Sequence, residues 1–148
     1  MKLQFIILLT PFLFSCSNNK KDDPGSDIPI HNYDEVSERF ISWNDSLSLN
    51  NEHYYVYYFS RTCKYCDELK NEVIDIALNK CNALYFCNDN AIIIQDLDPI
   101  HTIGISDISN LYIRGFPSLI EVRNNTVTDH LLGKSKVITF LRNLTSGI

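Results

Sequence analysis

The sequence predicts a single α/β domain in which a central mixed β-sheet is flanked by helices. Segments with strand character alternate with segments whose apolar residues recur at helical spacing, roughly in the order β-α-β-α-β-α-β-β-α. Residues 53–59 are a run of aromatics and valine without polar alternation, which is typical of a central strand covered on both faces. Residues 118–123 and 126–128, separated by Asn124 and Asn125, have the pattern of a hairpin. A length of 148 residues, with 45% hydrophobic and 21% charged, fits one globular domain.

Two short elements are expected before the 53–59 strand. Residues 27–30 are expected to form a short edge strand, since Pro29 removes a donor that an inner strand would need. Asn32 is a suitable cap for a helix over residues 33–43, whose large apolar residues fall at helical spacing behind an acidic first turn.

The elements after that strand follow from the same patterns. Apolar residues on one face predict a helix over residues 66–79, and the isoleucine-rich residues 91–97 predict another buried strand. A weak helix is expected over residues 106–112. After the hairpin, Ser135 is the expected cap of a last helix.

Residues 1–15 have the layout of a secretory signal peptide. Lys2 supplies a positive charge, and residues 3–14 supply an apolar core of 12 residues, shorter than the roughly 18 needed to span a membrane. Ser15 then stands directly before Cys16. This arrangement resembles the lipobox of bacterial lipoproteins, in which the peptide is cut before the cysteine and the cysteine sulfur carries a diacylglycerol. The alternative is a soluble secreted protein that is cut nearby and keeps Cys16 free.

Residues 16–27 are expected to be a lipidated cysteine and a flexible linker. After Cys16 the segment has no apolar side chain that could contribute to a core. More than one lipid chain is needed for lasting attachment, which a diacylglycerol provides. Residues 28–148 then form the folded domain, long enough to bury its own core.

The charge balance argues against a nucleic-acid partner. The chain carries 13 Lys and Arg against 18 Asp and Glu, a formal net charge of −5. Nucleic-acid binding depends on clustered positive charge, which this composition does not supply. The unusual feature is instead the five cysteines, whose positions indicate the chemistry.

Cys63 and Cys66 form a Cys-x-x-Cys motif where the 53–59 strand passes into the next helix. In this position the N–H groups of the first helical turn stabilise a thiolate. We expect Cys63 to be the exposed nucleophile and Cys66, one turn further in, to resolve the mixed disulfide. Lys64 and Tyr65 between them should tune the redox potential and contact the substrate. A disulfide pair carries both electrons, so neither a cofactor nor a metal is expected.

These features resemble the thioredoxin-like thiol–disulfide oxidoreductases over most of residues 28–148. The matching parts are the strand and loop that lead to the cysteine motif, the strand end at residues 96–98, residues 113–119, and Gly133 before the last helix. Residues 113–119 match the cis-proline loop of that family.

The resemblance implies a thioredoxin-like fold and a defined substrate site. In that family the proline that corresponds to Pro117 has a cis peptide and faces the cysteine pair. Phe116, just before it, would offer its backbone N–H and C=O to an extended substrate.

Two departures from the thioredoxin pattern affect the chemistry. Thioredoxins carry a buried acid six residues before the first active-site cysteine, as proton acceptor for the resolving thiol, and this chain has Tyr57 there. A phenol with a pKa of about 10 is a poor base at neutral pH. The dipeptide Lys64-Tyr65 replaces Gly-Pro and places an aromatic before the second cysteine, as in glutaredoxins. The strongly reducing potential of thioredoxin therefore cannot be transferred.

Cys81 and Cys87 form a second pair with three interpretations. The first is a structural disulfide that closes a small loop in an oxidising exterior. The second is a redox relay with the active site. The third is a zinc site made by all four of these cysteines, although the spacing of the second pair is wide for a zinc knuckle.

Together these features predict a membrane-anchored, extracytoplasmic thiol–disulfide oxidoreductase. Its expected partners are protein thiols and disulfides of the cell envelope, the membrane through a lipid on Cys16, and a membrane electron-transfer partner, with no nucleic acid. The alternative is a non-catalytic binding or accessory module of an envelope export complex of the bacteriocin type, which the tyrosine at position 57 keeps open. The sequence leaves the direction of exchange undecided.

Overall fold

The computed structural model describes residues 29–89 and 91–146. The predicted signal peptide, residues 1–15, and the predicted linker with Cys16, residues 16–27, lie outside these ranges. The strands are β1 (His53–Tyr58), β2 (Leu84–Cys87), β3 (Ser118–Arg123) and β4 (Thr126–Leu132), and the α-helices are α1 (Lys64–Asn79) and α2 (Lys134–Ser146). Short 3₁₀ helices are η1 (Tyr33–Arg39), η2 (Trp43–Asp45), η3 (Pro99–Thr102) and η4 (Ile108–Asn110). Within the described part, no helix is long and apolar enough to cross a membrane.

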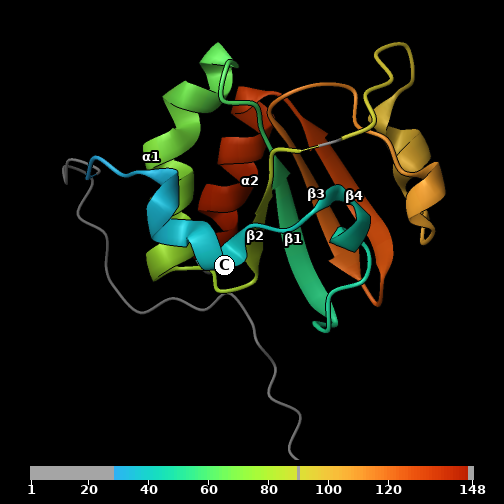
Figure 1. Cartoon of the computed structure of the whole chain (residues 1–148), viewed down its shortest axis with the longest axis horizontal. Coiled ribbons are helices and arrows are strands. Elements are labelled where there is room, and N and C mark those ends of the chain that lie inside the picture. The colour runs from blue at the N-terminus through green and yellow to red at the C-terminus, as the bar shows by residue number, and fades with distance from the viewer. Residues whose placement is uncertain (1–28, 90, 147–148) are drawn as a thin grey trace, which may run out of the picture.

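The four strands form one mixed sheet in the order β2-β1-β3-β4 (Figure 1). Strand β1 runs parallel to β2 and antiparallel to β3, and β3 runs antiparallel to β4. A single parallel bridge between Phe40 and Phe86 covers part of the outer edge of β2. The predicted class, a central mixed sheet flanked by helices, is confirmed.

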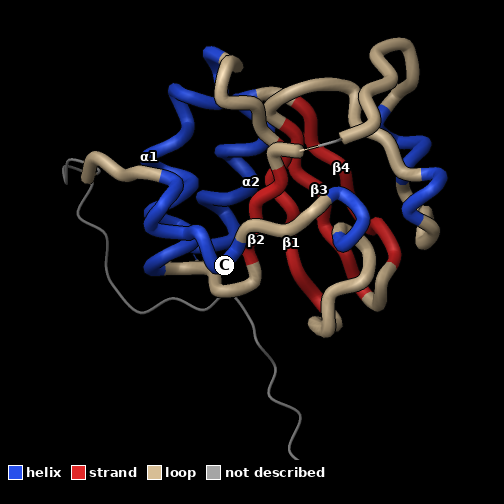
Figure 2. The backbone as a smooth tube through the Cα atoms, viewed as in Figure 1, coloured by secondary structure: helices blue, strands red, loops and turns tan. Residues whose placement is uncertain are grey.

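Strand β1 is covered on both faces, as its aromatic run predicted. Every side chain from Tyr54 to Tyr58 is buried. On one face Tyr55 contacts Phe140 of α2, with ring centroids 5.7 Å apart. On the other face Tyr58 contacts Trp43 of η2, at 5.4 Å. Helices α1 and α2 lie together on one side of the strands (Figure 2).

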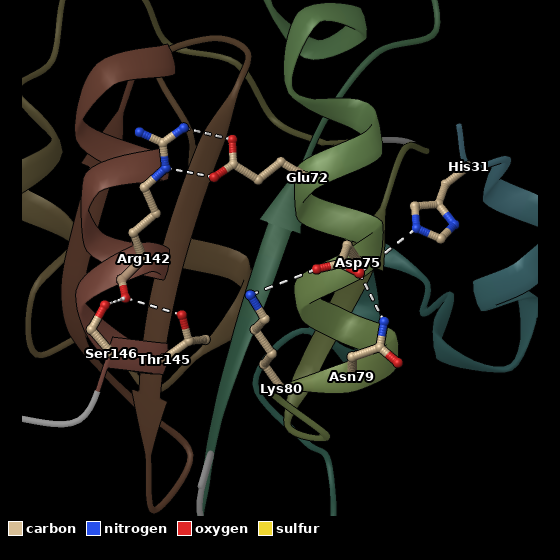
Figure 3. A network of polar contacts seen from close by, with 8 residues as sticks. All are labelled: His31, Glu72, Asp75, Asn79, Lys80, Arg142, Thr145 and Ser146. Carbon is tan, nitrogen blue, oxygen red and sulfur yellow. Dashed lines mark hydrogen bonds and ion pairs between the residues drawn. The ribbon is translucent and has the colours of Figure 1, made fainter. Parts of the chain in front are cut away.

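Ion pairs join the two helices on their exposed side. The Arg142 guanidinium of α2 makes a bidentate pair with Glu72 of α1, including an Nη2–Oε2 distance of 2.8 Å (Figure 3). At the end of α1, the Asp75 carboxylate accepts a hydrogen bond from Asn79 at 2.8 Å and lies 3.8 Å from Lys80. Surface ion pairs contribute about 0–1 kcal/mol each, so these contacts add little to the stability of the fold.

The hairpin and the last helix form close to where they were expected. Asn124 and Asn125 have positive φ angles of 48° and 60°, as the turn of a tight two-residue hairpin requires. Strand β4 continues to Leu132, beyond the predicted end at residue 128. Helix α2 follows Gly133, whose φ is 91°, so Ser135 lies inside the helix and does not cap it.

Other predicted elements were wrong. Residues 91–97 do not form a buried strand: Ile92, Ile93 and Ile94 are 44%, 44% and 38% exposed, and the segment joins the fold through one parallel bridge from Ile93 to Ile113. Strand β2 occupies the position beside β1 instead, because it follows α1 directly and pairs along its whole length.

The weakly helical regions are also shorter than predicted. The helix expected over residues 33–43 is divided into η1 and η2, with a non-helical Val36 (φ −116°, ψ 22°) inside η1. The helix expected over residues 106–112 is reduced to η4. Pro29 and Ile30, the described part of the expected edge strand 27–30, are irregular.

The hairpin turn provides a test of the fold. Asn125→Val should lower the free energy of unfolding by about 1–2 kcal/mol, because a β-branched residue does not tolerate a φ of 60°. Asn125→Gly, the matched control, should leave stability unchanged or raise it, since glycine adopts this conformation without a steric penalty. Urea unfolding followed by circular dichroism measures both. A valine variant as stable as the glycine variant would show that this turn is not formed.

Candidate active site

The two cysteines of the motif lie in the first turn of α1. Cys63 is the N-cap residue, and its sulfur accepts a hydrogen bond from the Cys66 N–H at 3.2 Å. The Cys63 N–H donates to the Ser60 carbonyl at 3.1 Å, and the Cys63 carbonyl accepts from Asp67 N–H at 3.1 Å. The loop from β1 is therefore anchored on both sides of Cys63, and one free N–H group of the first helical turn, that of Cys66, points at its sulfur, as it would at an anion.

The two thiols have different environments. Both are free, but Cys63 is partly exposed while Cys66 is only 1% exposed. Burial, and then the hydrogen bond with Cys63, raise the pKa of Cys66 to about 12. The Ser60 backbone N–H and the Tyr57 hydroxyl act in the opposite direction and lower the pKa of Cys66. Cys63, the nucleophile predicted from the sequence, is thus the accessible thiol. Cys66, the predicted resolving thiol, is the buried one.

Lys64 and Tyr65 lie on the surface of the first turn. Tyr65 is 58% exposed, so its ring is available to a partner. Lys64 is also exposed, and its charge acts on Glu68, whose pKa is lowered first by a hydrogen bond from Lys134 and further by Lys64.

The proline loop reaches the same end of the sheet as the cysteine motif. The Phe116–Pro117 peptide is cis, as the resemblance implied. Ser118, directly after it, pairs with Tyr58, the last residue of β1. The Pro117 carbonyl accepts a hydrogen bond from Gly133 N–H at 2.8 Å, whereas the Phe116 N–H and C=O have no partner among the described residues. Phe116 therefore has the unpaired backbone groups that an extended substrate would need.

An aromatic stack lies beneath the cysteine pair, and sequence reasoning missed it. The rings of Tyr33 and Phe59 are 4.2 Å apart at 17°, and those of Phe59 and Tyr57 are 5.7 Å apart at 12°. The hydroxyls of both tyrosines are buried without a hydrogen-bond partner in the described part of the chain. The Arg61 guanidinium lies 5.8 Å from the Tyr33 ring centroid. Only the aromatic run of β1 indicated this stack, since Tyr33 comes from a distant segment.

The predicted disulfide between Cys81 and Cys87 is absent, because Cys87 is a free, buried thiol. Its sulfur lies 3.5 Å from Oδ1 of Asp89, and burial raises its pKa to about 12. The reason is the unpredicted strand β2, which carries the chain roughly 10 Å along the sheet between Leu84 and Cys87. A disulfide spans only about 4.4–6.8 Å between Cα atoms. Cys81 lies at the opposite end of this strand.

No group of three or more His, Cys, Asp or Glu side chains that could hold a metal ion occurs among residues 29–89 and 91–146. The zinc site considered from the sequence would need Cys81 and Cys87 together with the Cys63–Cys66 pair. Strand β2 instead separates Cys81 from Cys87.

Comparisons with known proteins give distant structural similarities. No family model matches the chain, and no curated protein matches it. Among solved structures, thioredoxin f2 of Chlamydomonas reinhardtii is similar at 14% identity and a TM-score of 0.49, over 74% of this chain and 97% of that one. The long form of thioredoxin f from spinach chloroplast is similar at 13% and 0.47, over 74% and 89%. A Plasmodium falciparum thioredoxin is similar at 16% and 0.44, over 70% and 96%.

The fold is thioredoxin-like. The strand order and directions of the sheet, the cysteine motif after β1 and the proline loop before β3 carry this assignment. The distant similarities do not bear on what this thioredoxin-like domain does.

The unequal burial of the thiols predicts unequal alkylation. At pH 7.5 iodoacetamide should modify Cys63 and leave Cys66 intact, because a thiol with a pKa of about 12 has very little thiolate at that pH. Modification of Cys66 should then rise about tenfold per pH unit until its pKa is approached. Peptide mass spectrometry measures each site, and Cys87 provides a second buried thiol for comparison. Equal modification of Cys63 and Cys66 at pH 7.5 in the folded chain would contradict the assigned environments.

Proposed function

We propose that the chain is a thiol–disulfide oxidoreductase that exchanges disulfides with cysteines of other proteins. The observation that carries the proposal is the pair itself: a partly exposed Cys63 receives the Cys66 N–H at 3.2 Å, with a buried Cys66 one turn behind it. A partly exposed sulfur that accepts a hydrogen bond from a helix N–H is accessible to a client disulfide. The buried Cys66 thiol, one turn away, can react with the Cys63 sulfur of the same chain but is shielded from other proteins.

The exchange proceeds in two displacements. The Cys63 thiolate attacks a client disulfide, which forms a mixed disulfide and releases one client thiolate. The Cys66 thiolate then attacks the Cys63 sulfur and releases the second client thiolate, which leaves a Cys63–Cys66 disulfide. Two electrons pass to the client, and the reverse sequence oxidises a client dithiol. The pair carries both electrons, so the proposal includes no cofactor and no metal.

The client would bind along the first turn of α1 and the proline loop. Tyr65 and Lys64 are exposed beside the pair, and Phe116 has unpaired backbone groups. An extended client segment can donate to and accept from these groups, with its cysteine held against Cys63. Pro117 shapes the wall of this groove.

We further propose that the domain works outside the cytoplasm, tethered to a bacterial membrane. The support is the signal-peptide layout of residues 1–15, the lipobox-like sequence before Cys16 and the polar residues 16–27. The partners would be cysteines of envelope proteins and a membrane component that renews the redox state of the pair. With a net charge of −5, a nucleic-acid partner is not proposed.

A binding or accessory module of an envelope export complex is the second candidate. The observation that favours it is the environment of Cys66, whose pKa is raised to about 12 by burial, and the tyrosine at position 57 in place of an acid. Resolution of a mixed disulfide would then be slow, and the domain would bind a partner protein without completing disulfide exchange with it.

Single cysteine variants distinguish the two candidates. Cys63→Ser should abolish reduction of a protein disulfide, because the attacking sulfur is lost. Cys66→Ser should accumulate a mixed disulfide with the client, because the resolving thiol is lost. Insulin reduction measures turnover, and non-reducing gels with mass spectrometry identify the trapped species.

Cys87→Ala is the matched control, since it removes another buried thiol and should leave turnover unchanged. Unchanged turnover in Cys63→Ser would refute the proposal. No turnover in the wild-type chain, together with a stable partner in pull-downs, would favour the accessory module.

A further inference from the structure

Two positively charged side chains flank Cys63 on the surface of the domain. Arg61 stands two residues before the sulfur, in the loop from β1, and Lys64 follows it directly, in the first turn of α1. Both side chains are exposed, and neither forms an ion pair within the described part of the chain. The whole chain has a formal net charge of −5, so the surroundings of Cys63 differ in sign from the protein as a whole.

The acidic side chains at this end of the sheet do not neutralise the two cations. Each of them contacts another group: Asp67 lies 3.7 Å from Lys70, Glu68 pairs with Lys134 of α2, and Asp89 accepts a hydrogen bond from the Cys87 thiol at 3.5 Å. The positive charges of Arg61 and Lys64 are therefore left without a carboxylate in contact, and they remain available to a partner.

A third cation belongs to the proline loop. Arg114 stands two residues before Phe116, in the loop that reaches the same end of the sheet as the cysteine motif (Figure 1). Its side chain is exposed, and its Nε donates to the Gln95 carbonyl at 2.7 Å. This bond orients the guanidinium, while the two terminal amino groups have no partner among the described residues.

Arg61 is also oriented, by the face of an aromatic ring. Its guanidinium carbon lies 5.8 Å from the ring centroid of Tyr33, within the range of a cation–π contact. The Tyr33 ring is in turn stacked on Phe59, with centroids 4.2 Å apart, so it is fixed by the core. An oriented guanidinium loses less conformational entropy when it binds a carboxylate, and it can bind both oxygens at once.

We propose that Arg61, Lys64 and Arg114 form a cationic rim around Cys63 that selects clients with acidic residues beside their reactive cysteine. The inference rests on the proposed function and names the chemistry of the client. Carboxylates on the two sides of the client cysteine would meet cations from two separate loops, whereas a basic segment would be repelled. Charge complementarity of this kind acts mainly on the rate of association and on the choice of partner.

Three synthetic peptides probe the cationic rim. Each has one cysteine, activated as a 2-pyridyl disulfide and flanked on both sides by glutamate, glutamine or lysine. In the full chain carrying Cys66→Ser, the Cys63 thiolate attacks the cysteine sulfur of the peptide, which forms a mixed disulfide and releases pyridine-2-thione, measured by its absorbance. A chain that also carries Cys63→Ser gives the background rate. The glutamine peptide reports the intrinsic reactivity of the thiolate, so rates divided by its rate report charge selection alone.

The glutamate peptide should react about tenfold faster than the lysine peptide at low salt, an effect within the range of electrostatic steering. The ratio should approach one in about 1 M salt, where the Debye length is about 3 Å. A thiolate without the cationic rim would give the opposite order, because its own negative charge repels the glutamate peptide. A ratio at or below one at low salt would overturn the inference.

Variants of the rim should change this ratio. Arg61→Gln, Lys64→Gln and Arg114→Gln should each lower it about two- to threefold, as loss of one steering charge does, whereas Arg61→Lys should preserve it. Arg123→Gln is the matched control, since it removes one exposed arginine at the other end of β1, where Arg123 pairs with His53. It should leave the ratio unchanged. An equal fall in Arg123→Gln would show that net charge decides the rate, and would contradict the inference.

Insulin reduction by the wild-type chain separates this inference from the proposed function. Charge selection in a chain that reduces no protein disulfide would uphold the cationic rim and refute the proposed function. Turnover of a protein client without charge selection among the three peptides would do the reverse.

Discussion

The rest of the structure depends on one constraint: strand β1 is buried on both faces and paired with another strand on both edges. The strand is hydrogen-bonded to β2 and β3, and its alternating tyrosines pack against α1 and α2 on one face and η2 on the other. A strand held in this way has a fixed end. The chain leaves it at Tyr58, so the loop that carries Cys63 and Cys66 starts from a position that is paired with strands on both sides. The pairing of Tyr58 with Ser118 then brings the proline loop to the same end.

The same constraint explains the chemistry of the pair. The first turn of α1 leaves Cys63 partly exposed and points the Cys66 N–H at its sulfur, while the Cys66 side chain is buried in the core. Burial alone would keep Cys66 protonated, which would make it a poor attacking group. Interactions with the Ser60 backbone and the Tyr57 side chain lower the pKa of Cys66 and offset part of this effect. The two sulfurs thus differ in access: that of Cys63 is partly exposed, and that of Cys66 is buried.

The parts of the fold that were predictable are those with strong local patterns. The aromatic run of β1, the amphipathic α1, the Asn124-Asn125 turn and the apolar face of α2 each specify their element with little help from the rest of the chain. Strand β2 was missed because four residues after a helix carry less signal than the isoleucines at 92–94. Which of the two segments pairs with β1 is decided by connection length and sheet geometry. Apolar residues spaced at i and i+3 are compatible with a 3₁₀ helix and with an α-helix. The division of residues 33–43 into two 3₁₀ helices therefore had no signal in the sequence.

For the candidate site, the motif located the two sulfurs and their different exposure, because a Cys-x-x-Cys at a helix start leaves little freedom. The orphan hydroxyls of Tyr33 and Tyr57 could not be predicted, since the stack that holds them joins η1 to β1 through tertiary packing. The state of Cys87 was predicted wrongly because it depended on β2.

The central claim is that Cys63 and Cys66 form one two-electron couple. The most direct test equilibrates the full chain with glutathione buffers of graded potential and identifies bonded cysteines by thiol-trapping mass spectrometry. The account predicts a two-electron transition that joins Cys63 to Cys66 and leaves Cys87 as a thiol. A chain in which this pair forms no disulfide, or in which Cys87 replaces Cys66 as the partner of Cys63, would contradict it.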